Sequence, residues 1–295
     1  MNPRERGFLL LTSHLGDPER RPLTVAQFRS LTQRMQAASF SGEDRALETR
    51  DLVALGYSLD MAERISGLLE QEDVLDHYLR RGRKQGCIPI SRVSEGYPAI
   101  LRQRLGLDSP GCFWAKGDVS ILSRPAVSLV GSRDLGEENR RFAVSVGEHA
   151  AQMGWTLISG NARGADRTAQ EACLAAGGSV ISIVADTLAE HMPRENLLYL
   201  SEESYDAAFS AQRALSRNRC IHAMGYLVFV AQCSFHKGGT WDGTVRNLRS
   251  GWSTVAVFRD GSEASLELEQ MGAYLIGPGE LDDFGALTPR DIRLF

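Results

Sequence analysis

The sequence predicts an α/β protein in which an extended Rossmann-like, doubly wound, mostly parallel sheet follows a small all-helical domain. After Pro110, short β-branched apolar runs alternate with longer amphipathic runs, which is typical of parallel strands covered by helices on both faces. Before residue 105, apolar side chains recur at helical spacing instead. The 295 residues suffice for two domains. We therefore expect a helical domain over 1–105, a Rossmann-like domain over 106–278 and a short acidic tail over 279–295.

The N-terminal domain is predicted from helical periodicity and from capping residues. Apolar residues recur every three or four positions from Val25 to Met35, and Thr24 stands where it can cap that helix. Asp60 is a second candidate cap. The segment around Gly56 predicts two short helices joined by a turn. We expect this domain to contain helices only.

The strands and helices of the second domain are predicted from its alternating apolar and amphipathic segments. Strands are expected over 126–130, 156–158, 179–184, 226–230 and 254–258. Helices are expected over 137–153, 165–176, 207–223 and 242–250. In an open parallel sheet, ligands bind beyond the carboxyl ends of the strands. A functional site is therefore expected in the loops that follow these strands.

The charge distribution limits the kind of ligand surface that the protein can have. The chain carries 33 basic and 37 acidic residues, so it lacks the cationic body of a nonspecific DNA binder. The last 37 residues hold 3 basic and 8 acidic residues, whereas residues 107–258 hold 14 and 15. The Rossmann-like domain is thus almost neutral, and any anion-binding surface on it should be a confined one.

Cysteine and histidine spacing argues against metal and disulfide chemistry. The five cysteines form no Cys-x-x-Cys pair, and the six histidines show no metal-ligand spacing. We expect no metal, no cofactor and no catalytic constellation, and therefore no enzyme. Because no apolar run approaches the roughly 18 residues that a membrane helix needs, we expect a cytoplasmic protein without membrane contact.

A glycine-containing loop follows the strand expected at 126–130. Gly131 lets the backbone turn sharply and approach a ligand, Ser132 offers a hydroxyl group, and Arg133 can bind phosphate through its two-pronged guanidinium. An ordinary turn with a solvent-exposed arginine explains these residues equally well.

A second such loop follows the strand expected at 156–158. Ser159, Gly160 and Gly164 lead into a helix, where free backbone N–H groups and the positive helix end make an anion cradle beside Arg163. Asp166 could cap that helix, hold a ribose hydroxyl or orient Arg163. The loop matches neither the Gly-x-Gly-x-x-Gly fingerprint nor a Walker loop, which disfavours hydride transfer and NTP hydrolysis.

A third loop, Lys237-Gly238-Gly239-Thr240, follows the strand expected at 226–230. Three loops of this kind at the ends of parallel strands could form one composite phosphate-binding floor. Lys237 would then contribute a point charge to it; the alternative is a solvated loop lysine.

An arginine-rich run precedes that strand. Arg213 and Arg217 are four residues apart and share a helical face, while Arg219 points elsewhere. Asn218 lies between two arginines, which favours a ligand-facing role over a merely solvated face. A separate basic cluster at 80–84 could contact phosphate, although a solvated helix end is the favoured interpretation.

These motifs together resemble the DprA/Smf family of bacterial DNA-processing proteins. The resemblance covers roughly residues 50–278, and its pieces stand in the family's order. They are Tyr97-Pro98 with Leu101, Lys116-Gly117-Asp118, Val130-Gly-Ser-Arg133, Ser159-Gly-x-Ala-Arg-Gly-x-Asp166, Gly177-Gly178, Pro193-x-Glu-Asn196, Arg217-Asn-Arg219 and Gly238-Gly239-Thr240. A small helical, SAM-like domain before the Rossmann-like domain also fits that family.

The resemblance implies a protein that binds single-stranded DNA, protects incoming strands and loads a RecA-type recombinase in natural transformation, acting as a homodimer. Its implied contacts with nucleic acid or nucleotide are Gly131, Ser132, Arg133, Ser159, Gly160, Arg163, Gly164, Asp166, Arg217, Asn218, Arg219, Lys237, Gly238, Gly239 and Thr240.

This chain departs from the family pattern at several positions. Gln170 stands where the family usually has histidine, Lys237-Gly-Gly stands in for Ser-Gly-Ser, and Arg259-Asp-Gly replaces the usual Pro-Gly. The sequence ends at Phe295, so we expect a divergent member without the winged-helix tail of many relatives.

A second hypothesis makes the same site a pocket for a nucleotide, in a sensor or a nucleotide-processing protein. Related phosphoribohydrolases share a Gly-Gly-x-Gly-Thr motif followed by a catalytic glutamate. Here Asp242-Gly-Thr244 is followed by no such glutamate, which disfavours hydrolysis by that route.

Overall fold

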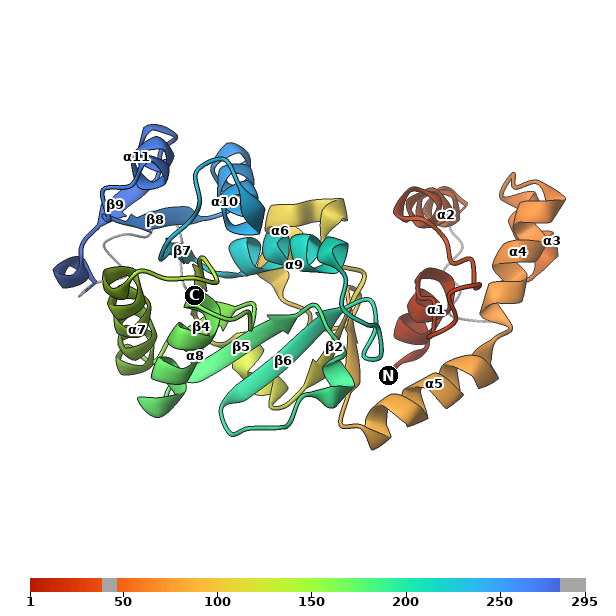
Figure 1. Ribbon diagram of the computed structural model, residues 1–295. Coiled ribbons are helices and arrows are strands. Elements are labelled where there is room, and N and C mark those ends of the chain that lie inside the picture. The colour runs from red at the N-terminus through yellow and green to blue at the C-terminus, as the bar shows by residue number, and fades with distance from the viewer. Residues whose placement is uncertain (39–46, 282–295) are drawn as a thin grey trace.

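The computed structural model describes residues 1–38 and 47–281, which form a helical N-terminal part and a large sheet covered by helices (Figure 1). Residues 282–295 of the expected acidic tail lie outside the described residues. The N-terminal helices are α1 (Pro3–Thr12), α2 (Val25–Ala37), α3 (Thr49–Ala54), α4 (Leu59–Leu69) and α5 (Glu72–Lys84).

Local sequence signals set the boundaries of these helices. Thr24 caps α2 as predicted, because its hydroxyl accepts a hydrogen bond from Gln27 N. The turn between α3 and α4 contains Gly56 at φ +85°, which also agrees with the prediction. The prediction that Asp60 caps a helix is wrong, since Ser58 accepts the hydrogen bond from Met61 N and Asp60 already lies in the first turn.

The sheet has nine strands in the described residues, in the order β1-β2-β6-β5-β4-β3-β7-β8-β9. The strands are β1 (Ile88–Ser91), β2 (Cys112–Lys116), β3 (Ala126–Val130), β4 (Thr156–Ser159), β5 (Ser179–Val184), β6 (Leu197–Glu202), β7 (Leu227–Val230), β8 (Thr254–Phe258) and β9 (Tyr274–Ile276). β2 is antiparallel to both β1 and β6, and the other pairs are parallel. The predicted mostly parallel, Rossmann-like sheet is confirmed.

Helices cover both faces of this sheet, as the alternation of buried side chains along the strands requires. They are α6 (Ala99–Leu105), α7 (Glu137–Gln152), α8 (Ala165–Ala175), α9 (Ala211–Met224), α10 (Gly238–Ser250) and α11 (Glu263–Gln270), and Figure 1 shows α7 and α8 on one face and α9, α10 and α11 on the other. In β3, Val127 and Leu129 join the core beneath α7 and α8, whereas Ala126 and Val130 join the core beneath α9 and α10.

The predicted all-helical character of residues 1–105 ends before residue 88. β1 is an edge strand of the large sheet, and α6 contributes Leu101 and Leu105 to the core under α9. Pro89 lies within β1. A proline usually indicates a loop, so the sequence did not predict this strand, although an edge strand tolerates a proline. The helical part packs onto the sheet at this end through α5 and β1.

The two parts share one hydrophobic core. Tyr78 of α5 stacks on Tyr205 with ring centroids 4.7 Å apart, and Trp114 of β2 packs edge-on against Tyr205 at 4.7 Å. Arg81 forms an ion pair with Asp206 across the same junction. Of the basic cluster at 80–84, Arg81 is therefore engaged within the chain.

One buried histidine connects α9 with α10. His222 is fully buried, and the amide of Asn247 lies 3.3 Å from its Nδ1 atom. The Asn247 amide nitrogen also donates to Ser253 Oγ, and its oxygen accepts from Ser253 N, so this amide nitrogen faces Nδ1 as a donor. Nδ1 therefore accepts, and the Nε2–H group has no partner in the described part of the chain.

Candidate functional site

The loops after β3, β4 and β7 meet at the carboxyl edge of the sheet. β3 pairs with β4 on one side and β7 on the other, so the chain reverses its winding direction between β3 and β7. Such a switch point leaves a crevice where the loops diverge. The prediction that these three loops share one place is confirmed.

Hydrogen bonds join the three loops into one floor. Ser132 N donates to Gln232 O at 2.9 Å, and Ala165 N donates to Ser132 O at 3.1 Å. Thr240 Oγ1 donates to Gly131 O at 3.1 Å, which attaches the start of α10 to the loop after β3. The loop after β3 is thus hydrogen-bonded to both of the other loops.

Two glycines permit this close approach. A Cβ atom at Gly131 would lie 2.4 Å from the Cβ of Ala165, the first residue of α8. Gly164 has φ +89°, and a Cβ there would lie 2.4 Å from the carbonyl oxygens of both Ser132 and Arg133. Any side chain at either position would push the loops apart.

Arg217 of α9 reaches into the floor from the side. Its side chain is 10% exposed, and its Nη1 atom donates to Ile183 O at 3.1 Å and lies 3.8 Å from Asp166 Oδ2. A Cβ at Gly160 would lie only 1.2 Å from that Nη1 atom. Gly160 therefore makes room for a guanidinium group.

Asp166 supports the second loop from beneath it. Its Oδ2 atom accepts a hydrogen bond from Ala162 N at 3.1 Å, so it fixes the loop before α8. Burial raises the pKa of Asp166, and the neighbouring Arg217 opposes that rise. Asp166 therefore faces Arg217, and not Arg163 as one interpretation of the sequence suggested. Arg163 forms an ion pair with Asp134 on the surface, with Nη2 and Oδ1 2.7 Å apart.

Arg217 keeps one donor group free for an anion. Burial lowers the pKa of Arg217, and the positive charge of Arg133 lowers it further, against the opposing effects of Asp166, Asp186 and Glu202. The Nε atom of Arg217 is buried and has no hydrogen-bond partner among the described residues. A bound phosphate would offset the repulsion between the two guanidinium groups.

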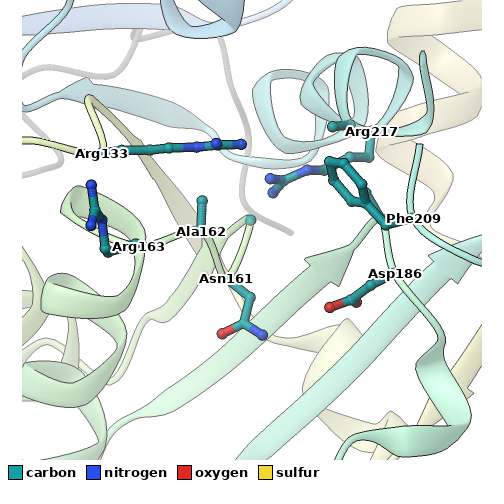
Figure 2. A pocket seen from close by; sticks show the side chains of 10 residues that line it. Arg133, Asn161, Ala162, Arg163, Asp186, Phe209 and Arg217 are labelled. Atoms are coloured by element: carbon teal, nitrogen blue, oxygen red, sulfur yellow. The ribbon is translucent and has the colours of Figure 1, made fainter. Parts of the chain in front are cut away.

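Two adjoining pockets lie on this floor and together form a trough. One, of about 310 Å³, is lined by Arg133, Arg163, Arg217 and Asp186 among others. The other, of about 480 Å³, extends past Arg133 and Arg217 to Lys237. Figure 2 shows the Arg133 and Arg217 side chains reaching toward each other from opposite walls.

Most of the predicted contact residues line this trough. They are Gly131, Ser132, Arg133, Gly160, Arg163, Asp166, Arg217, Asn218, Lys237, Gly238, Gly239 and Thr240. Gly164 packs within the floor, and Ser159 is buried with its hydroxyl donating to Leu129 O. Asn218 bridges helices, because its amide donates to Gly239 O at 3.1 Å.

Arg219 lies apart from the trough. It borders a different pocket of about 940 Å³ between the helical part and the sheet, and its Nη2 atom lies 3.7 Å from Glu202 Oε2. Arg213 donates to the carbonyl oxygens of Ala185, Ala207 and Ala208, so it holds the chain before α9 in place.

Two residues that line the trough belong to none of the sequence motifs. Phe209 lines both pockets and is 59% exposed, which is unusual for a phenylalanine. Asp186 follows β5 and lines the smaller pocket. An aromatic residue close to an arginine-rich run is the one clue that could have identified Phe209.

Three further sequence features concern the described residues outside the trough. No group of three His, Cys, Asp or Glu side chains in the described ranges could hold a metal ion. No helix in the described ranges is both long and apolar enough to cross a membrane. Gln170, where the family usually has histidine, is buried in α8 and lies 3.4 Å from Ser182 Oγ, away from the trough.

Comparison with known families agrees with the arrangement of these loops. Residues 89–276 match the family described as DNA recombination-mediator protein A. The chain belongs to this family. It is 28% identical over 234 residues to the DNA processing protein DprA of Bacillus subtilis, covering 74% of this chain and 77% of that protein. It is 26% identical to the DprA protein of Streptococcus pneumoniae, over 65% of this chain and 71% of that one.

Solved structures of the family share the fold. The structure of DNA processing protein A from Streptococcus pneumoniae superposes with a TM-score of 0.66 at 23% identity, over 88% of this chain and 97% of that chain. The protein from Helicobacter pylori, whose structure concerns its mode of binding single-stranded DNA, gives a TM-score of 0.56 at 22% identity, over 67% and 93%.

Proposed function

We propose that the protein binds single-stranded DNA in the trough at the ends of β3, β4 and β7. The observation that carries the proposal is the convergence of Arg133, Arg163, Arg217 and Lys237 on one trough with an exposed Phe209 at its rim. Cations neutralise successive phosphates, and an aromatic ring offers a stacking surface to a base. The relatives named DNA processing protein support the same ligand.

The exposed aromatic side chain favours a single strand over a duplex. Bases in a duplex are stacked on each other and paired, so they present no free ring face to Phe209. We therefore expect binding to oligothymidylate to exceed binding to a duplex of the same length.

The experiment is fluorescence anisotropy with a labelled 20-nucleotide oligothymidylate over a range of salt concentrations. Arg133→Ala and Lys237→Ala should each weaken binding and reduce the slope of log K against log salt by about one phosphate contact. Arg141→Ala is the matched control, because Arg141 lies exposed on α7 beside Glu137. If the full chain shows no binding at low salt, or if the control weakens binding equally, the proposal is wrong.

The bound strand is proposed to receive a RecA-type recombinase, with the protein acting as a homodimer in the cytoplasm and without catalysis of its own. Family membership supports these expectations. Recombinase ATP hydrolysis on a covered strand should start sooner when this protein is present. Analytical ultracentrifugation should give twice the 32.4 kDa of one chain.

A nucleotide pocket is the second candidate function, favoured by the size of the smaller pocket. Its volume of about 310 Å³ is at the lower end of the range for small-molecule sites. Thermal stabilisation by nucleoside monophosphates, without stabilisation by oligonucleotides, would favour this candidate. Release of free base from them would show hydrolysis, which the absent glutamate after Asp242-Gly-Thr244 argues against.

A further inference from the structure

One end of the trough carries a negative charge in an otherwise cationic site. Asp186, which follows β5, lines the smaller pocket and its side chain is 53% exposed. His191 Nε2 lies 2.8 Å from Asp186 Oδ1, and the His191 ring stacks on Tyr199 at 4.6 Å. The hydrogen bond from His191 lowers the pKa of Asp186, so this residue is a carboxylate at neutral pH.

A carboxylate at this place would repel the phosphate that the arginines attract. Figure 2 shows Asp186 below Phe209 and Arg217, on the wall opposite Arg133 and Arg163. The guanidinium of Arg217, whose side chain is nine-tenths buried, points into the same space. The pocket therefore combines arginines that can hold an anion with a carboxylate that can accept hydrogen bonds from a donor group.

Asn161 is a second polar residue of the smaller pocket. Figure 2 shows its amide nitrogen on the side of the cavity where Asp186 lies. Its backbone has φ +60°, a conformation that asparagine tolerates better than most residues. The pocket lining thus includes both an amide, which can donate, and a carboxylate, which only accepts.

We propose that Asp186 makes the trough selective for an unpaired guanine, an inference that rests on the proposed binding of single-stranded DNA. Guanine presents N1–H and N2–H donors side by side, with the O6 acceptor adjacent to them. Asp186 can accept from both donors, and Asn161 can donate to O6. Thymine sets one donor between two acceptors, and adenine and cytosine each set one amino group beside an acceptor, so a carboxylate pairs with them less well.

The remaining contacts fit a single nucleotide. A guanine ring against Phe209 would direct its Watson–Crick edge toward Asp186, while the attached phosphate stays on the opposite wall, near Arg133 and Arg163. That edge is engaged in pairing within a duplex. The same carboxylate would therefore contribute to the discrimination against double strands.

The test is competition against a labelled 20-nucleotide oligothymidylate by five unlabelled pentamers. Each pentamer has two thymidines on either side of a central guanine, hypoxanthine, adenine, cytosine or thymine. The full chain should prefer the guanine pentamer over the thymine pentamer by about tenfold, which is the size of a good bidentate base contact. Hypoxanthine, which keeps N1–H but lacks the 2-amino group, should fall between them.

Asp186→Asn should abolish this preference, so that the guanine and thymine pentamers compete equally with the labelled oligothymidylate. Asp242→Asn is the matched control, since Asp242 is exposed on α10 and lines neither pocket of the trough. The control should keep the preference for guanine.

Equal competition by all five pentamers, or a preference that survives in Asp186→Asn, would overturn the inference while leaving DNA binding intact. A uniform loss of affinity in Asp186→Asn would also overturn it, because that result assigns Asp186 to the sugar or to the fold. Failure of the oligothymidylate itself to bind would instead remove the proposed function, and the inference with it.

Discussion

His222 makes the stability of the protein depend on pH between about 4 and 6.5. Burial lowers the pKa of His222 from 6.5 to about 4, because a charged ring would lie in an apolar interior. Its Nε2 atom faces Gly243, where a Cβ would come within 2.9 Å, and it has no hydrogen-bond partner among the described residues. The folded state therefore contains the neutral ring.

The size of the effect follows from the two pKa values. The folded pKa lies below the unfolded one, so the unfolded state binds more protons in this window and stability falls as pH falls. The full difference between the two pKa values corresponds to about 3 kcal/mol well below pH 4. Between pH 7 and pH 5 the loss assigned to His222 is about 2 kcal/mol.

Urea unfolding at pH 7 and pH 5 measures this loss. Other groups titrate in the same window, so the informative quantity is the difference between the wild type and His222→Gln. The variant should lose about 2 kcal/mol less than the wild type on going from pH 7 to pH 5. An equal loss in both proteins would show that His222 is not buried as a neutral ring.

Three further substitutions test the trough and the junction with the helical part. Gly160→Ala should displace Arg217 and leave Asp166 poorly paired, lowering the free energy of unfolding by about 2 kcal/mol and weakening DNA binding; unchanged urea unfolding would contradict it. Phe209→Ala should weaken oligothymidylate binding about tenfold by loss of stacking, whereas Phe209→Trp should retain it, as anisotropy can show. Arg81→Met should lower the free energy of unfolding by only about 1 kcal/mol, because this ion pair is partly exposed, and should leave DNA binding unchanged, because neither partner lines the trough; weaker binding in this variant would show that the junction and the trough are coupled.

Strands that are rich in β-branched residues could be predicted from the sequence. The run over 179–184 is rich in β-branched residues and forms β5 over the predicted range. β6 was missed although it is equally buried, because its apolar residues are leucine and tyrosine and none is β-branched. β2, with Phe113 and Trp114, and the short edge strand β9 were also missed. Composition alone does not separate such strands from buried helices or loops.

The starts of α9 and α10 were predicted less well than their ends, whereas α7 and α8 begin at the predicted residues. α10 begins at Gly238 rather than at 242, and α9 begins at Ala211 rather than at 207. In α10 the glycines suggested a loop, but Gly238 and Gly239 are already helical. Both glycines line the trough, and a Cβ at Gly239 would lie 2.9 Å from the Asn218 amide nitrogen, so this glycine lets α10 begin close to α9.

The convergence of the loops could be predicted from topology, but the partners of individual side chains could not. Arg217 and Arg219 are two residues apart and look alike in the sequence, yet only Arg217 reaches the trough. Phe209 and Asp186 belong to no motif, and their positions depend on how the chain after β5 and before α9 packs. That packing is set by contacts such as those of Arg213, which are distant in sequence.

Different groups determine the shape of the trough and its charge. Backbone and hydroxyl groups of Gly131, Ser132 and Thr240 hold the three loops together, while Arg133 and Lys237 project from them as exposed side chains. Over evolutionary time a lineage can therefore exchange the projecting side chains one at a time without refolding the site. The same scaffold can then be retuned toward strands of another base composition or toward another anion.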